Sequence, residues 1–285
     1  MGKISYDPIK DRFARLIRNS RSLRRVFYFL LDLFFLRSWH IRRLLRRAGK
    51  RLDEQGEWAV LDAGCGFGQY DRFILAQFEN ARLVSVDIKT AYIDACRNYF
   101  EAEIASGSAR FGIEDLVEME KENQFDLILC VDVLEHIEND LTVIRNLVHA
   151  LKPGGQLLMH SPSHLSEADS GGDEESFVGE HARPGYSKKD ISEKYRKAGL
   201  SIDRVHYTYG PVGHLSWVIS VKYPLILLNR IGMAGLLLLV VYYPIVLPGC
   251  LLMNLADLYT ANRKGHGIYA LGTHLPGQTG AKNGS

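Results

Sequence analysis

The sequence predicts an α/β fold, a Rossmann-like open parallel sheet, and three observations support it. Short β-branched segments alternate with helical patterns between residues 52 and 161, which is typical of a parallel sheet with helices on both faces. A glycine-rich turn joins the first strand to the first helix, and acidic residues end two later strands. We expect strands at 58–63, 83–87, 125–131 and 156–161, and helices at 71–78, 91–105 and 141–151.

The composition excludes disordered and fibrous classes. The chain has 285 residues, of which 46% are hydrophobic and 24% charged, and this is ordinary globular composition. The four cysteines are too far apart in sequence for a zinc site and too few for a disulfide framework. We therefore expect free thiols and no metal.

Charge is distributed unevenly along the chain. Residues 1–51 carry 15 Lys and Arg against 3 Asp and Glu, whereas the remainder carries 20 against 30. A basic arm on an acidic body indicates an anionic partner for the arm, either a membrane surface or nucleic acid.

Residues 1–51 form a predicted basic amphipathic helical arm. Arginines recur every third residue from Arg12 to Arg24, and an apolar run over 26–36 is too short to span a bilayer. Such a pattern favours a helix in a membrane interface, and the alternative is a helix packed on the protein's own core. The apolar face is too continuous for a solvated phosphate binder, so we expect no nucleic acid.

The strongest motif is the segment VLDAGCGFGQY at residues 60–70. Glycines at 64, 66 and 68 let the backbone turn tightly and approach a ligand. The third glycine comes one residue too early for the G-x-G-x-x-G dinucleotide fingerprint. Asp87 ends the next strand, where an acid can hold ribose hydroxyls.

Four segments in order, VLDAGCGFGQY, VSVDI, FDLILCVDVLEHI and LKPGGQLLMHSPS, resemble the class I S-adenosylmethionine-dependent methyltransferases. The likeness is to the small-molecule group that includes quinone methyltransferases, and it covers residues 52–210 as a core. A last strand within 263–275, HGIYALGTH, resembles the reversed final strand of that family's sheet. The resemblance implies S-adenosylmethionine as cofactor and S-adenosylhomocysteine as product.

The resemblance also implies roles for individual residues. Asp87 would hold the ribose hydroxyls, and Ile88 would flank the adenine. Gly112 stands where the family has an acid facing the adenine, so Glu114 or Asp115 would replace that contact. The methionine moiety would lie on a set of residues at the glycine-rich turn: Asp62, Ala63, Gly64, Cys65, Gly66 and Gly68. The methyl-transfer site would be bordered by Val131, Asp132 and His136.

Catalysis by such an enzyme consists mainly of alignment, because the sulfonium methyl is already activated. A base is needed only for an acceptor that is protonated at working pH. The candidate bases and site residues are His136, His160, His181, Asp132 and Tyr186, with His164 as a weaker candidate.

Residues 162–186 are rich in Gly, Ser and acids, and they are expected to form a lid that contains His181 and Tyr186. The alternative is a disordered surface excursion. A helix over 187–198 with Ser187 as its N-cap and a strand over 201–209 should follow.

Residues 211–262 form a hydrophobic insert. No charge occurs from residue 231 to 256, long enough to span a bilayer, although Pro244 and Pro248 interrupt the run. The chain must return to the side it left if the last strand joins the sheet, which excludes a single span. A monotopic hairpin is favoured, and two spans, a soluble lid or a dimer face stay open. The tail, 276–285, is expected to be disordered.

These features predict a methyltransferase that acts on a lipophilic small molecule at the cytoplasmic face of a membrane. The alternatives are a non-catalytic membrane adaptor with a cofactor-binding fold and, less favoured, a nucleotide-cofactor oxidoreductase. The acceptor, its reacting atom and the oligomeric state stay open.

Overall fold

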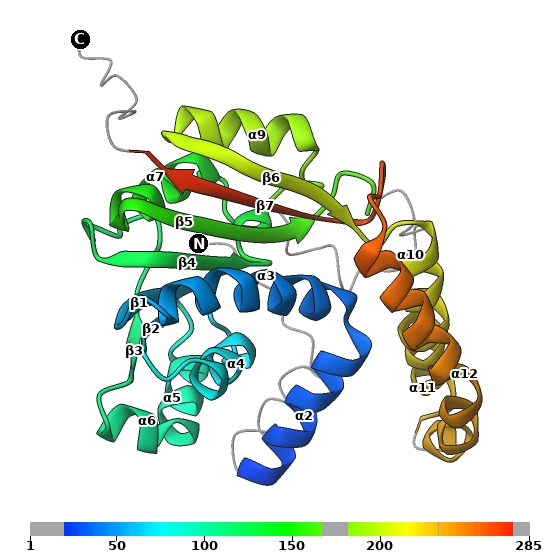
Figure 1. Cartoon of the computed structure of the whole chain (residues 1–285). Coiled ribbons are helices and arrows are strands. Elements are labelled where there is room, and N and C mark those ends of the chain that lie inside the picture. Colours follow the sequence, from blue (N-terminus) through cyan, green and yellow to red (C-terminus); the bar gives the residue numbers. More distant parts are fainter. Residues whose placement is uncertain (1–19, 167–181, 233, 276–285) are drawn as a thin grey trace.

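The computed structural model describes residues 20–166, 182–232 and 234–275 (Figure 1). Most of the expected lid, His181 within it, the first part of the basic arm and the tail 276–285 lie outside these residues.

A seven-stranded sheet with the order β3-β2-β1-β4-β5-β7-β6 forms the centre of the molecule. Neighbouring strands from β3 to β5 pair in parallel, whereas β7 is antiparallel to both β5 and β6. The expected reversed last strand is therefore confirmed. The strands are β1 Trp58–Ala63, β2 Ala81–Asp87, β3 Ala109–Ile113, β4 Phe125–Val131, β5 Leu151–Pro162, β6 Leu200–Thr208 and β7 Gly267–His274.

The pattern missed β3 and merged two helices into one. The expected helix over 91–105 is α5 Thr90–Tyr99 followed by α6 Glu101–Ala105, because Phe100 leaves helical geometry at φ −99°, ψ 29°. The edge strand β3 has the short sequence ARFGI, in which a glycine weakens the strand pattern.

Helices cover both faces of the sheet, and the core divides accordingly. Alternate residues of β4 face opposite sides: Ile128 and Cys130 belong to one buried cluster, Leu127 and Leu129 to the other. The first cluster includes side chains of α7 Asp140–Ala150 and α9 Lys188–Lys197, and the second those of α4 Gln69–Gln77 and α5. The Ser187 N-cap is confirmed as a reciprocal capping box with Asp190.

The basic arm forms two helices, α2 Arg21–Phe34 and α3 Leu36–Asp53, which meet at the extended residue Phe35. The apolar side of α3 packs on the sheet's own core, as the alternative interpretation of the arm expected. Arg42 pairs with Asp32 at 2.5 Å, and Arg43 donates to the Leu258 carbonyl at 2.6 Å. These two arginines therefore make internal contacts rather than facing an external anionic surface.

The hydrophobic insert folds as a helical hairpin that projects from the core (Figure 1). Its first arm runs through α10 Pro211–Trp217, a π-helical turn Val218–Lys222 and α11 Tyr223–Ile231. Its second arm is α12 Ala234–Tyr259, a continuous helix, so the expectation that prolines interrupt this run is wrong. The arms are joined by the Ser216 hydroxyl, which donates to the Cys250 carbonyl at 3.0 Å. Residues 211–231 and 235–259 are each long and apolar enough to cross a membrane, and only 22% and 11% of their most apolar stretches are buried.

Candidate functional site

The glycine-rich turn between β1 and α4 forms a backbone cradle at the carboxyl end of the sheet. Gly64 has φ +85°, and a Cβ there would lie 2.3 Å from a Val133 methyl, so only glycine fits. Gly66 has φ +53° and open space where a Cβ would point. The turn therefore leaves its backbone accessible to a ligand at Gly66.

Asp87 fastens the end of β2 to this turn. Its carboxylate accepts hydrogen bonds from the backbone N–H groups of Gly66 at 3.0 Å and Lys89 at 2.8 Å. Each oxygen retains capacity for a further donor, such as a hydroxyl. The structure thus places Asp87 beside the cradle, as the sequence predicts.

A pair of buried carboxyl groups lies beneath the cradle. Burial, together with the neighbouring Asp71, raises the pKa of Asp62 well above its usual range. Burial raises the pKa of Asp71 to about 6, although the Ser85 hydroxyl donates to it at 2.7 Å. Asp62 Oδ2 is buried and receives no hydrogen bond from an N–H or hydroxyl group of the described residues, and its neighbour is the carboxyl group of Asp71. A buried carboxyl pair that lacks such a donor is costly, so it marks a place for a ligand's donor group.

Two exposed isoleucines stand at the ends of β2 and β3. Ile88 is 63% exposed and Ile113 is 51% exposed, although both are large and apolar. Asp87 pairs with Ile113 in the register, so the two isoleucines come from adjacent strand ends. Sequence reasoning named Ile88 and missed Ile113, because β3 was not recognised.

The two acids proposed to replace the adenine contact have local partners. Glu114 forms an ion pair with Lys121, and Asp115 accepts from the Val117 N–H at 2.9 Å. The structure therefore gives each carboxylate a partner in its own loop.

Asp132, directly after β4, is the centre of a partly buried polar relay. It adopts φ +53°, and its carboxylate pairs with Arg37 through Oδ2 and with His160 Nδ1 through Oδ1 at 2.8 Å. His160 Nε2 lies 3.2 Å from the Thr208 hydroxyl. Burial, and then the charge of Arg37, lowers the pKa of His160 to about 3. His160 is therefore a neutral histidine whose two ring nitrogens are engaged by Asp132 and Thr208.

The other candidate catalytic residues are dispersed. His136 is exposed at the end of a 3₁₀ turn, Leu134–His136, rather than at the start of a helix. Tyr186 is only 1% exposed, and its hydroxyl donates to Asp140 at 2.6 Å. That contact holds Tyr186 behind the 3₁₀ turn, and its expected role at the methyl-transfer site stays a prediction. His164 lies at the surface, with Nδ1 3.4 Å from the Tyr186 carbonyl.

Sequence reasoning missed the contribution of α2 to the cradle. Arg24 is 2% exposed, and its guanidinium donates to the Phe67 carbonyl at 2.6 Å and to the Ala95 carbonyl. The Tyr28 hydroxyl donates to the same Phe67 oxygen. Arg24 belongs to a run of similarly spaced arginines, so no sequence signal distinguishes it from its exposed neighbours.

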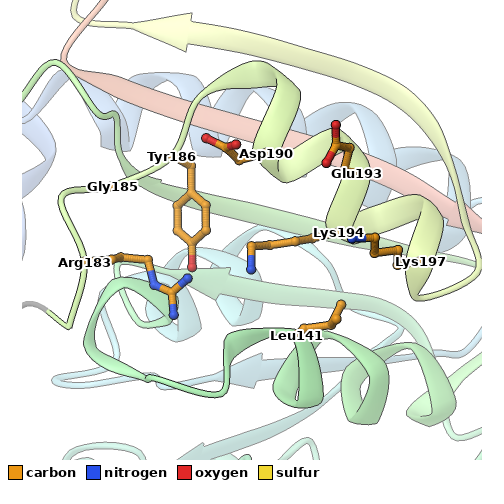
Figure 2. Close-up of a pocket in the computed structure, with 8 residues that line it drawn as sticks. All are labelled: Leu141, Arg183, Gly185, Tyr186, Asp190, Glu193, Lys194 and Lys197. Atoms are coloured by element: carbon orange, nitrogen blue, oxygen red, sulfur yellow. The ribbon is translucent and has the colours of Figure 1, made fainter.

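A separate cavity of about 270 Å³ lies between α7 and α9 (Figure 2). Three of its lining residues, Arg183, Lys194 and Tyr186, contact Asp140 behind the lining, with Arg183 and Lys194 at 2.6 and 2.8 Å. None of the glycine-rich turn lines this cavity, so it is not the cofactor cradle. Its lining residues are Leu141, Arg183, Gly185, Tyr186, Asp190, Glu193, Lys194 and Lys197.

Comparisons with known proteins agree with this geometry. A family model described as a methyltransferase domain matches residues 61–157. A ubiquinone biosynthesis O-methyltransferase of Coxiella burnetii is 32% identical over 99 residues, which are 34% of this chain and 41% of that protein. A wheat (Triticum aestivum) phosphoethanolamine N-methyltransferase 1 is 33% identical over 125 residues, 41% of this chain and 24% of that protein. The chain thus spans less than half the length of these curated relatives.

Among solved structures, the fold is similar to that of phosphoethanolamine N-methyltransferase 2 of Haemonchus contortus in complex with S-adenosyl-L-methionine. The TM-score is 0.59 at 19% identity, over 96% of this chain and 61% of that one. The family model thus identifies a methyltransferase domain over residues 61–157, which agrees with the class I S-adenosylmethionine-dependent methyltransferase expected from the sequence motifs.

Proposed function

We propose that this protein transfers a methyl group from S-adenosylmethionine to a lipophilic small molecule at a membrane surface. The observation that carries the proposal is the cradle itself. Asp62 Oδ2 is buried without an N–H or hydroxyl donor among the described residues, and it lies beneath a turn whose Gly66 opens into free space.

The residues of the cradle fit this cofactor at three points. Asp62 and the backbone from 64 to 68 would hold the methionine moiety, whose ammonium group is a donor for this Asp62 oxygen. Asp87 has oxygen lone pairs for the ribose hydroxyls. The exposed side chains of Ile88 and Ile113 would be covered by the adenine ring.

The protein's own contribution to the reaction is orientation. When bound, the cofactor supplies a methyl group that is already activated for transfer. Asp132 and Val131, at the end of β4, would border the acceptor, and the contacts of Arg37 and His160 hold the Asp132 carboxylate in place. His136 is then the candidate base among the described histidines, because it is exposed and lies in the loop that follows β4.

The hairpin supports a lipophilic acceptor. Its outer side chains include Leu237, Val240 and Ile245, which are 75%, 69% and 74% exposed. An apolar surface of this kind marks a membrane or protein interface. The matched O-methyltransferase acts in ubiquinone biosynthesis by its name, and a quinone-like acceptor drawn from a bilayer suits the same arrangement.

Calorimetric titration with S-adenosylhomocysteine tests the cradle. We expect the wild-type protein to bind in the micromolar range or tighter, and Asp87→Ala and Gly66→Val each to abolish measurable binding. Asp203→Ala is a matched control, since Asp203 is exposed on β6 and contacts Gln156 and Thr273. Unchanged affinity in both cradle variants would contradict the assignment of this site.

A further inference from the structure

We propose that α2 is a second membrane-contacting helix, and that through it contact with the bilayer tightens cofactor binding. The inference rests on the proposed function for the identity of the cofactor. It goes beyond that function because it couples two binding events through one helix.

The inner face of α2 holds the cofactor cradle. Arg24 and Tyr28, one helical turn apart, both donate to the carbonyl of Phe67, which lies between Gly66 and Gly68. Asp32, one turn further, accepts from the Gln69 amide at 2.9 Å, and Gln69 is the first residue of α4. Three successive turns of α2 therefore contact the glycine-rich turn and the helix that follows it.

The outer face of the same helix is apolar and exposed. Val26 is 51% exposed, Phe29 60% and Leu30 39%, and helical geometry places them opposite Arg24 and Tyr28. The acid of α2, Asp32, is paired with Arg42, whereas Arg25 is exposed. The outer face thus offers apolar side chains and a positive charge, which fits the boundary of an anionic bilayer.

The position of α2 relative to the hairpin supports a single bilayer as its partner. The two project from the same side of the core (Figure 1), and the rings of Phe34 and Tyr243 lie 5.0 Å apart where α2 meets α12. A bilayer that received the hairpin would therefore meet the outer face of α2 as well. Restraining α2 from outside would hold Arg24 and Tyr28 on Phe67, so the cradle would be ordered before the cofactor arrives.

Thermodynamic linkage makes this proposal testable from both sides. If vesicles raise the affinity for S-adenosylhomocysteine by some factor, S-adenosylhomocysteine must raise the affinity for vesicles by the same factor. We expect a factor of about five or more, at the lower end of the usual range for coupled sites.

The experiment measures the Kd of S-adenosylhomocysteine for the full chain in detergent and on vesicles of phosphatidylcholine and phosphatidylglycerol. Phe29→Asp and, as a second independent variant, Val26→Asp should reduce the coupling factor to about one while leaving the detergent Kd unchanged. Both positions are exposed, so folding should be retained. Leu275→Asp is the control, because Leu275 is 39% exposed beyond the end of β7, and it should keep the wild-type factor.

Co-sedimentation with the same vesicles, with and without saturating S-adenosylhomocysteine, supplies the reciprocal readout. A wild-type factor of one, absence of vesicle binding, or the wild-type factor in both α2 variants would overturn the coupling. Absence of S-adenosylhomocysteine binding in detergent and on vesicles alike would contradict the proposed function, and the coupling would fall with it.

Discussion

The cradle and the hairpin depart in opposite ways from the usual distribution of polar and apolar groups between surface and interior. The cradle buries carboxyl groups, and Asp62 Oδ2 receives no hydrogen bond from an N–H or hydroxyl group of the described residues. The hairpin does the reverse, since it exposes leucine and valine side chains such as Leu237 and Val241. Under the proposed function each irregularity has a ligand of opposite character, a polar cofactor in one case and an apolar bilayer in the other.

The largest expected effect tests the rigidity of the cradle. Gly64→Val should destabilise the fold by about 3 kcal/mol or more, because its Cβ would overlap Val133 and its φ of +85° is strained for valine. Thermal unfolding checks this, and Gly249→Ala is the control. A Cβ at Gly249 meets nothing within 4 Å in α12, so that change should be neutral or slightly stabilising. A Gly64→Val protein as stable as the wild type would refute the tight fit.

A charged substitution on the hairpin tests whether its apolar surface enters a bilayer. Leu237→Asp should weaken vesicle binding by roughly 100-fold, since an acid in a bilayer core costs about 3 kcal/mol. The free energy of unfolding of the core should not change, because Leu237 is 75% exposed. Vesicle flotation measures the first effect and chemical denaturation the second. Undiminished flotation would show that this surface does not enter the bilayer.

Removal of the buried charge of Arg24 tests whether α2 supports the cradle, because Arg24 contacts the glycine-rich turn. Arg24→Met should weaken S-adenosylhomocysteine binding about tenfold by releasing the Phe67 and Ala95 carbonyls. The exposed neighbour Arg25 provides the matched control, Arg25→Met, with little effect on the same titration. Equal affinities in the two variants would show that Arg24 of α2 does not support the cradle.

A further comparison concerns the pH dependence of stability. The pKa of Asp71 is raised to about 6 in the folded protein, so the folded state holds this proton more tightly than the unfolded chain does. The resulting stability is present below about pH 4 and is lost as the pH rises to about 6, by about 1–3 kcal/mol. Asp71→Asn should lack this component. The difference in free energy of unfolding between wild type and variant should therefore change with pH over this range, as unfolding curves would show.

His160 provides a comparison of opposite sign. Its pKa is lowered to about 3, so its contribution to stability is present above about pH 6.5 and is lost as the pH falls toward 3. The difference in free energy of unfolding between wild type and His160→Gln should therefore change with pH in the direction opposite to that for Asp71→Asn. The same sign for the two variants would contradict the assigned protonation states.

The sequence predicted the parts of this molecule that are governed by local pattern. Strand–helix alternation predicted β1 and β4 to the residue, and four ordered motifs predicted the cradle around Asp87. It missed contacts made across long separations, such as Arg24 with Phe67 or Arg37 with Asp132. Spacing within the basic arm is the same for buried and exposed arginines, so only the packing of α2 and α3 distinguishes them.

The central claim is methyl transfer to a lipophilic acceptor, and radiolabelled cofactor tests it directly. Purified protein is incubated with methyl-labelled S-adenosylmethionine and a lipid extract from the source cells, and the phases are then separated. We predict label in the organic phase with the wild type and none with Asp87→Ala. An organic phase without label, from wild-type protein that binds S-adenosylhomocysteine, would contradict the claim.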